Sequence, residues 1–261
     1  MITIVPCKEM PKEKEDKIIY VPNEGENDSM AKKLNRGIEI FLRKYPTEKI
    51  VCIRHDDAYV RTDPSVVEWQ IRQLTDNHKV GAVGLIGCCQ LYDSCTWWAP
   101  NRKINAIGAI KQGGVRQKTV NGLKLYTKKD NKPVMEEFEY PMIEKLGVCD
   151  YAATVDGCCM WFPRWIFEEG MRYDENLKDY HFYDADICLQ VLARGYKVAT
   201  NTNIEVMHKS VGEMPDYFNE LKKNFYTKWS ILTDNHWPIS RNTKFKDYNL
   251  LDKMIKEQYG Y

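Results

Sequence analysis

The sequence has no long apolar run, no excess of charge of either sign and no paired-cysteine motif, and each absence excludes a class of protein. No apolar stretch approaches the roughly 20 residues that a membrane-spanning helix needs, so we expect no membrane span. The start, MITIVPCKEM, becomes charged too soon to predict a secretory signal. With 38 basic and 37 acidic residues, the net charge of +1 predicts no nucleic-acid partner.

The nine cysteines are odd in number and include no C-x-x-C pair, which argues against a disulfide framework and a zinc site. Several lie inside apolar runs, where cysteine packs as a small hydrophobe. We therefore interpret them as reduced thiols of the core and expect a cytoplasmic location. The composition, 43% hydrophobic and 29% charged over 261 residues, is that of a globular chain with a sizeable core.

Short β-branched runs alternate with amphipathic helical patterns along much of the chain, which predicts an α/β fold with a mainly parallel sheet. Strands are predicted at residues 2–7, 18–22, 50–54, 80–87, about 158–162, 196–202 and 204–208. Helices are predicted from 28 or 29 to about 45, from 64 to about 77, after 163, from 184 or 186 to 194, and through about 214–261. We divide the chain into a domain at 1–212 and a helical C-terminal extension at 213–261 that packs on the same domain.

Polar residues stand where predicted strands end or helices begin. The strand in KIVCIRHDDAYV ends in His55-Asp56-Asp57, Asp156 precedes a buried run, Asp184 precedes a helix, and His208 follows an apolar stretch. Each has a simple structural explanation: a solvated loop, a turn, a helix cap, and a core histidine. Adjacent carboxylates at the end of a buried strand also suit a divalent cation with an anionic ligand, because ligands bind beyond the carboxyl ends of parallel strands.

The segment from Val155 to Val198 resembles the second half of a family 2-type glycosyltransferase of the GT-A fold. It carries, in order, VDGCCMWFP, PRWIF, GMRYDE, YDADICLQ and RGYKV. In the first half, AKKLNRGI is similar to the family's A-x-x-x-N-x-G-I helix, and His55-Asp56-Asp57 stand in place of its D-x-D motif. The resemblance covers roughly residues 2–212. The compact N-terminus and the many cysteines are also similar to the small glycosyltransferase domains of large algal viruses.

The resemblance implies a GT-A fold, Rossmann-like, with a mixed, mainly parallel sheet flanked by helices. It implies a hexosyl- or deoxyhexosyltransferase that moves a sugar from a nucleotide-diphosphate sugar, UDP-sugar by default, to a glycan or other hydroxyl acceptor. It further implies Mn²⁺ or Mg²⁺ on the diphosphate. The implied residues are Asp57 and His208 as metal ligands, Asp184 as the base of an inverting transfer, Asp156 near the sugar or acceptor, and Pro6, Asn23, Asn35, His55 and Asp56 on the donor side.

Several features depart from this pattern or leave alternatives open. His55 occupies the first D-x-D position, and Tyr183 stands where the family usually has Glu. Trp97 and Trp98 either stack on an acceptor sugar or pack in the core. Asp186 is expected to cap its helix. The alternative functions are a nucleotidyltransferase that makes nucleotide-sugars, whose Gly-rich loop is missing after the first strand, and an inactive carbohydrate-binding protein with the same fold. The oligomeric state stays open.

Overall fold

The computed structural model describes residues 1–25, 28–77, 79–96, 105–115, 117–120, 123–126, 128–129, 132–133, 135–141, 147–178, 180–209, 215–246 and 253. The elements of the first part are β1 (Ile2–Pro6), β2 (Ile18–Val21), α1 (Met30–Lys44), β3 (Ile50–Arg54), β4 (Ala58–Val60), α2 (Pro64–Asn77), β5 (Val80–Gly84), β6 (Ile86–Cys88) and β7 (Gln90–Leu91). The middle part contains β8 (Ala106–Val115), β9 (Gln117–Val120), β10 (Leu123–Tyr126), β11 (Lys128–Lys129), β12 (Lys132–Pro133) and β13 (Met135–Pro141). The last part contains β14 (Val148–Ala152), β15 (Thr154–Val155), β16 (Cys159–Pro163), α4 (Arg164–Glu168), α5 (Tyr183–Ala193), β17 (Lys197–Asn201), β18 (Val206–His208), α6 (Phe218–Leu232) and β19 (Ile239–Ser240).

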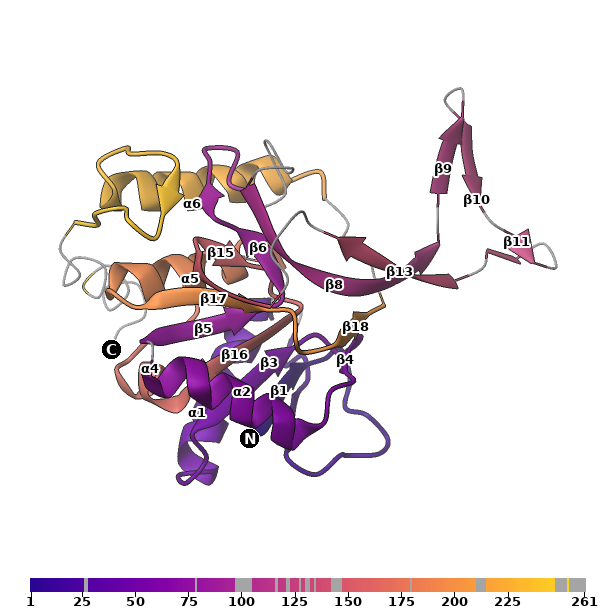
Figure 1. Ribbon diagram of the computed structural model, residues 1–261, viewed down its shortest axis with the longest axis horizontal. Helices are drawn as coiled ribbons and strands as arrows, with labels where there is room; N and C mark the ends of the chain where they lie inside the picture. The colour runs from indigo at the N-terminus through magenta and orange to yellow at the C-terminus, as the bar shows by residue number, and fades with distance from the viewer. Residues whose placement is uncertain are drawn as a thin grey trace.

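A seven-stranded sheet with the order β14-β17-β5-β16-β3-β1-β2 forms the centre of the molecule (Figure 1). β1 runs parallel to β2 and β3, and β17 runs parallel to β5. β16 is antiparallel to both β3 and β5, and β14 is antiparallel to β17. Five strands (β1, β2, β3, β5 and β17) therefore point the same way, which confirms the predicted mixed, mainly parallel α/β sheet flanked by helices.

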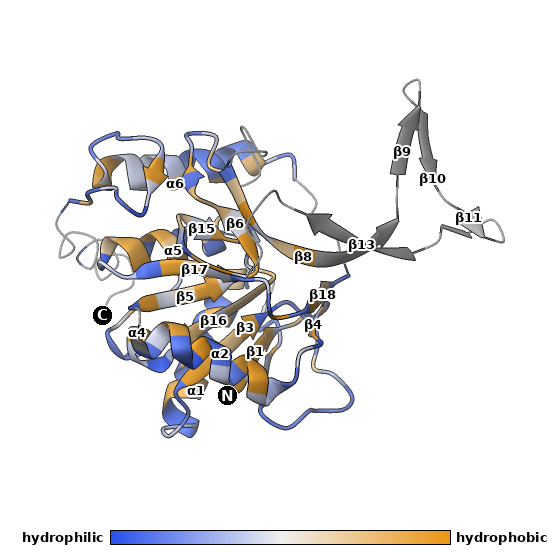
Figure 2. Ribbon diagram, in the orientation of Figure 1, coloured by the Kyte–Doolittle hydropathy of each residue, from blue (hydrophilic) through white to orange (hydrophobic). Residues whose placement is uncertain are grey.

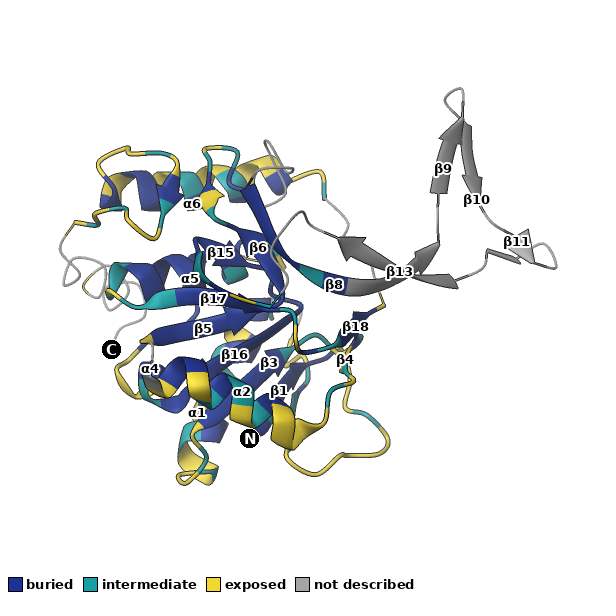
Figure 3. Ribbon diagram, in the orientation of Figure 1, coloured by how far each residue is buried: buried dark blue, intermediate teal, exposed yellow. Residues whose placement is uncertain are grey.

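The sheet is buried on both faces, as its strands in Figure 3 show. Along β3, Val51 and Ile53 pack with residues of α1 and α5, whereas Ile50 and Cys52 pack with residues of α2. This alternation follows from the two-residue period of a strand. The central strands are accordingly apolar along their length in Figure 2, which explains why the sequence shows continuous hydrophobic runs there.

The predicted starts and ends of the helices agree with the structure where their caps are local. Ser29 is the N-cap of α1, and its hydroxyl accepts a hydrogen bond from the Lys32 amide at 3.3 Å. Gly195, with φ of +78°, follows the last turn of α5. The charged segment at 8–17 contains no helix, as predicted, and β1 and β2 are nevertheless parallel neighbours. All nine cysteines carry a thiol rather than forming a disulfide, and eight of them are buried.

The single strand predicted at 80–87 is wrong. The run divides at Leu85 into β5, which belongs to the central sheet, and β6, which joins a second sheet with the order β15-β6-β8-β18-β4. The Leu85 carbonyl accepts a hydrogen bond from the Ala109 amide at 3.0 Å, so the chain leaves the first sheet at this residue to pair with the second. A continuous apolar run does not reveal such a change of sheet, because both segments are buried.

The C-terminal segment is helical only in part. α6 packs its Phe225, Trp229 and Leu232 into the main core, beside α5 (Figure 1). Residues 233–246 form turns and the short strand β19, which pairs with β7, so the prediction of a continuous helix is wrong there. The domain boundary at 212/213 stays a prediction. Among the helices that the structure describes, none combines the length and the apolar character needed to cross a membrane.

Candidate functional site

Polar side chains from four elements meet at the carboxyl edge of the central sheet. His55 and Asp57 directly follow β3, which ends at this edge. β16 is antiparallel to β3, so it begins where β3 ends, and the His55 amide donates to the Cys158 carbonyl at 2.9 Å. His208 is the last residue of β18, which pairs with β4 just beyond Asp57. The sheet topology thus gathers residues that lie far apart in the chain.

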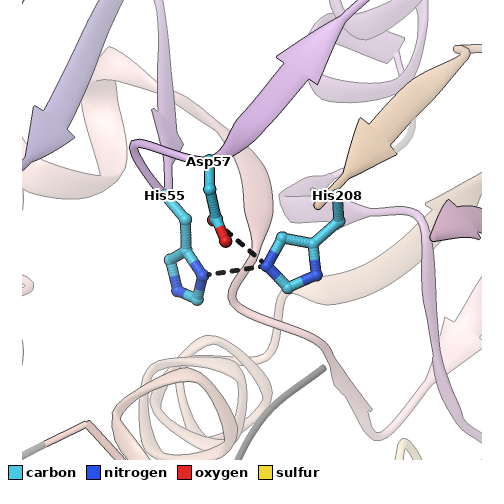
Figure 4. Close-up of side chains that lie close together, drawn as sticks. All are labelled: His55, Asp57 and His208. Atoms are coloured by element: carbon cyan, nitrogen blue, oxygen red, sulfur yellow. Dashed lines mark hydrogen bonds and ion pairs between the residues drawn. The ribbon is translucent and has the colours of Figure 1, made fainter. Parts of the chain in front are cut away.

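Two imidazoles and one carboxylate form a compact cluster at this edge (Figure 4). The His208 Nε2 atom lies 3.4 Å from His55 Nδ1 and 3.3 Å from Asp57 Oδ1. One ligand atom from each of the three residues lies within 4.8 Å of the others. The side chain of His208 is 11% exposed and that of Asp57 is 29% exposed, so the cluster is partly accessible to solvent.

This cluster has the dimensions of a divalent-cation site. Ligand atoms bound at about 2.1 Å to one ion, at angles of about 90–110°, lie roughly 3.0–3.4 Å apart. The distances from His208 Nε2 to His55 Nδ1 and to Asp57 Oδ1 both agree with this spacing. Imidazole favours borderline cations such as Zn²⁺, whereas carboxylate suits Mg²⁺ and Mn²⁺, so the mixed set favours a borderline ion over Mg²⁺. The sequence prediction of Asp57 and His208 as ligands did not include His55, which the structure adds to the set.

The pKa values of the two imidazoles shift in opposite directions. Burial, assisted by the charge of His208, lowers the pKa of His55, which favours the neutral ring with a lone pair that a cation can bind. Burial also acts to lower the pKa of His208, but the hydrogen bond to Asp57 and the charges of Asp156 and Asp57 outweigh burial and raise it. A proton therefore competes with a cation for His208, as for most imidazole ligands.

Tyr183 fixes the orientation of His55, and the sequence prediction missed this role. Its hydroxyl lies 2.7 Å from His55 Nε2, and the ring is 3% exposed. When the hydroxyl accepts the Nε2 proton, Nδ1 keeps its lone pair toward Asp57 and His208. Gly157 permits this contact, because a Cβ atom there would overlap the Tyr183 hydroxyl. The sequence contains two signals for this contact: the Asp156-Gly157 pair, and Tyr183 at the position where the family usually has Glu.

Asp184 and Asp156 lie at the same edge. Asp184 Oδ2 accepts from the Gly157 amide at 3.0 Å, and Oδ1 accepts from the Ala185 amide at 2.8 Å. Burial, with the charge of Asp156, raises the pKa of Asp184 to about 7. Asp156 Oδ1 accepts from the Cys158 amide at 2.9 Å. A half-buried carboxyl that titrates near neutrality is suited to accept a proton from a hydroxyl group.

The prediction that Asp186 caps α5 is wrong. Its carboxylate is fully buried and accepts hydrogen bonds from Lys228 Nζ at 2.7 Å, Trp229 Nε1 at 2.9 Å and Gln190 Nε2 at 2.8 Å. Lys228 also pairs with Asp174 at 2.8 Å. These contacts join α5 to α6. Sequence spacing alone could not reveal them, because the partners lie 42 and 43 residues away in the chain.

Of the donor-side residues predicted from the resemblance, Pro6, Asn23, His55 and Asp56 lie at or just after the ends of β1, β2 and β3, whereas Asn35 lies within α1. Pro6 is buried at the end of β1, and Asp56 is exposed after β3. Asn23, after β2, accepts from Lys33 Nζ at 2.9 Å. The Asn35 amide group donates to the Tyr173 carbonyl and to Glu175, and its oxygen accepts from the Tyr173 amide, each at 2.9 Å. Contacts of these residues with a nucleoside stay predictions. Trp97 and Trp98 lie outside the described residues.

Comparison with known proteins adds the following findings. A protein-family model with the description "Glycosyltransferase like family" matches residues 7–229. No curated protein matches the chain. Among solved structures, the chain is similar to the crystal structure of GalNAc-T7 with UDP, GalNAc and Mn²⁺, with a TM-score of 0.47 and 11% sequence identity. The aligned part covers 94% of this chain and 43% of that chain, so this chain spans less than half of that protein.

Proposed function

The chain belongs to the glycosyltransferase-like family, and from this premise we propose that it is a metal-dependent, inverting glycosyltransferase. In this proposal it transfers a hexosyl or deoxyhexosyl group from a nucleotide-diphosphate sugar to the hydroxyl group of a glycan or another acceptor. The observation that carries the proposal is the cluster of His55, Asp57 and His208 at the same sheet edge as Asp184. One edge thus offers both a cation site and a base.

The cluster would hold the cation that the family implies. Asp57 would bind it through a carboxylate oxygen, and His55 and His208 through Nδ1 and Nε2, the atoms that already converge. A bound divalent cation supplies a Lewis acid that stabilises negative charge on a diphosphate leaving group. We propose Mn²⁺ over Mg²⁺, because two of the three ligand atoms are imidazole nitrogens.

Asp184 would act as the base of the transfer. A carboxylate that accepts the hydroxyl proton on the face opposite the leaving group gives a single displacement, which inverts the anomeric carbon. Because burial raises the pKa of Asp184 to about 7, this carboxylate holds a proton more strongly than an exposed one. Two amide hydrogen bonds, from Gly157 and Ala185, fix its orientation. Asp156, on the same segment as Gly157, would contact hydroxyl groups of the sugar or the acceptor.

The donor would lie along the ends of β3, β1 and β2. Asp56 would contact the ribose, and Pro6, Asn23 and Asn35 would surround the nucleoside. UDP is the proposed nucleotide. Trp97 and Trp98 are proposed to stack on the acceptor sugar, since aromatic faces commonly cover the apolar faces of sugar rings.

A thermal-shift series with UDP and UDP-sugars, with and without Mn²⁺, tests the proposal. A ligand at about 100 times its dissociation constant stabilises a protein by about 2.7 kcal/mol, which raises the melting temperature by several degrees. We expect this shift for the wild type only with Mn²⁺, and not for Asp57→Asn. Asp16→Asn, a change of the same kind at an exposed loop position, is the matched control and should shift like the wild type.

Two results would contradict the proposal. If neither UDP nor a UDP-sugar stabilises the protein, with or without Mn²⁺, the cluster does not form part of a site for a UDP-sugar donor. If Asp57→Asn binds UDP-sugar as tightly as the wild type, with or without metal, the alternative of an inactive carbohydrate-binding protein is favoured. Release of pyrophosphate from a nucleoside triphosphate and a sugar phosphate would instead indicate a nucleotidyltransferase.

A further inference from the structure

Lys33 is a buried cation next to the candidate donor site. It lies in the first turns of α1, and the residue is only 2% exposed. Its Nζ atom donates to Asn23 Oδ1 at 2.9 Å and lies 5.4 Å from the centre of the Tyr180 ring. An ammonium group has three N–H donors. Among the described residues, one neutral amide oxygen and one aromatic face are the contacts that this group makes.

The ammonium group has no carboxylate partner within the described part of the chain. Asp28 acts on Lys33 electrostatically, but both of its oxygens bind Arg36, at 2.8 and 2.7 Å. Burial lowers the pKa of Lys33, and the charges of Asp28 and Asp56, which act to raise this pKa, do not offset burial. Buried charges are normally paired, because removing them from water is costly. Lys228, with two carboxylates within 2.8 Å, shows how this protein pairs a buried lysine elsewhere.

The position of Lys33 relates it to one part of a bound nucleotide. Its partner Asn23 follows β2, whereas Asp57 of the cation cluster follows β3. β1 lies between these two strands in the sheet. Neighbouring strands are about 4.8 Å apart, so the two sites are separated by roughly 10 Å along the same edge. A ribose and a base extend over a distance of this order from a diphosphate. Lys33 would therefore meet the outer edge of the base, not the phosphates.

We propose that Lys33 is a specificity-determining residue that donates a hydrogen bond to the carbonyl oxygen at the outer edge of the donor's base. This inference rests on the proposed function and names its substrate class: nucleotides of uracil or guanine, not of cytosine or adenine. Uracil O4 and guanine O6 are acceptors, whereas cytosine and adenine present an amino group at the same position. An ammonium group, which has donors only, pairs with the first two and opposes the last two.

Two neighbours support this assignment. Tyr180 is 46% exposed, and its ring lies beside Lys33, so it offers an aromatic face on which a base can stack. Asn23 accepts one hydrogen bond from the ammonium group, and no other oxygen or nitrogen atom of the described residues accepts one from it. In this proposal, a hydrogen bond to the carbonyl oxygen of the base offsets the cost of burying the Lys33 charge.

The test is a set of dissociation constants, measured by calorimetry with Mn²⁺ present, for two size-matched pairs: UDP against CDP, and GDP against ADP. For the wild type we expect UDP to bind more tightly than CDP, or GDP more tightly than ADP, by roughly 5- to 100-fold, depending on which pair binds. Lys33→Met should abolish this difference by weakening UDP or GDP. Lys32→Met, one residue away and exposed, is the matched control and should keep it. The Met side chain has a similar length and removes a buried charge for which the described residues provide no carboxylate partner, so we expect the variant to fold.

The outcomes separate this inference from the proposed function. If the wild type binds UDP and CDP equally, and GDP and ADP equally, the inference is overturned while the transferase proposal stands. If Lys33→Met weakens all four nucleotides and inorganic pyrophosphate to the same extent, Lys33 contacts phosphate and the inference is also overturned. If the wild type binds no nucleoside diphosphate, both proposals fail together. A loss of discrimination in Lys33→Met, with pyrophosphate binding unchanged, supports the inference.

Discussion

Replacing Lys228 by Met should destabilise the protein strongly, because it leaves two buried carboxylates without their cation. Lys228 Nζ lies 2.8 Å from Asp174 and 2.7 Å from Asp186, whose side chains are 4% and 0% exposed. Removing one partner of a buried ion pair typically costs about 3–5 kcal/mol, since the remaining charge keeps its desolvation penalty. The whole free energy of unfolding of a domain is about 5–15 kcal/mol. A single side chain on α6 therefore accounts for a large share of the stability.

The measurement is thermal unfolding followed by circular dichroism. At about 2–4 °C per kcal/mol for a domain of this size class, the expected loss corresponds to a decrease in melting temperature of roughly 6–20 °C. Lys223→Met, an exposed position on the same helix, is the matched control and should change the melting temperature by little. Adding Asp186→Asn to Lys228→Met should restore part of the loss, because the amide removes one unpaired charge while keeping an oxygen for Trp229.

The pH dependence of this loss has a definite sign. Burial raises the pKa of Asp186 above its usual value, and the charge of Lys228 opposes this increase. Without Lys228 the folded-state pKa rises further, so the folded protein binds a proton more tightly than the unfolded chain and loses stability as the pH increases. The deficit of Lys228→Met should therefore be larger at pH 8 than at pH 5. Equal melting temperatures for Lys228→Met and Lys223→Met at pH 8 would refute the argument.

Three further predictions follow from the site. Asp184→Asn should reduce transfer by about 10²–10⁴-fold and spare UDP binding. Because the pKa of Asp184 is raised to about 7, the wild type loses stability as the pH increases from 4 to 8, and the Asn variant does not. The melting temperature of the variant relative to the wild type should therefore increase over this range, and a constant difference would contradict the argument. His208→Ala should weaken Mn²⁺ binding, measured by electron paramagnetic resonance, and chelation of metal should abolish transfer by the wild type; unchanged Mn²⁺ affinity would exclude His208 as a ligand. Gly157→Ala should weaken Mn²⁺ binding as well, because the new methyl group displaces the Tyr183 hydroxyl from His55. An unchanged Mn²⁺ affinity would refute the role of Tyr183 in orienting His55.

Local signals account for the parts of the fold that the sequence predicted well. β1, β2, β3, α1 and α2 were all located from short apolar runs, helical periodicity and the cap at Ser29. These features depend on residues close in the chain, so they can be recognised without a structure. The run at 80–87 failed because the same burial serves two sheets, and nothing local marks the point at which the chain changes from one to the other.

For the site, the sequence by itself determined the residue types at the strand ends: the His-Asp-Asp after β3, the Asp-Gly before β16 and the His at the end of β18. It also supported the family resemblance. Only the tertiary structure decided how these residues meet. His55 contacts Tyr183 across 128 residues because α5 leads into β17, which runs parallel to β5, so that the helix begins at the edge where these strands end. It meets His208 across 153 residues because β18 pairs with β4 next to Asp57. The pairing of Asp186 with Lys228 and the burial of Lys33 beside Asn23 likewise depend on the packing of helices against that sheet. Contacts of this kind arise from the order of strands and the layering of helices, and neither is contained in the local pattern of side chains.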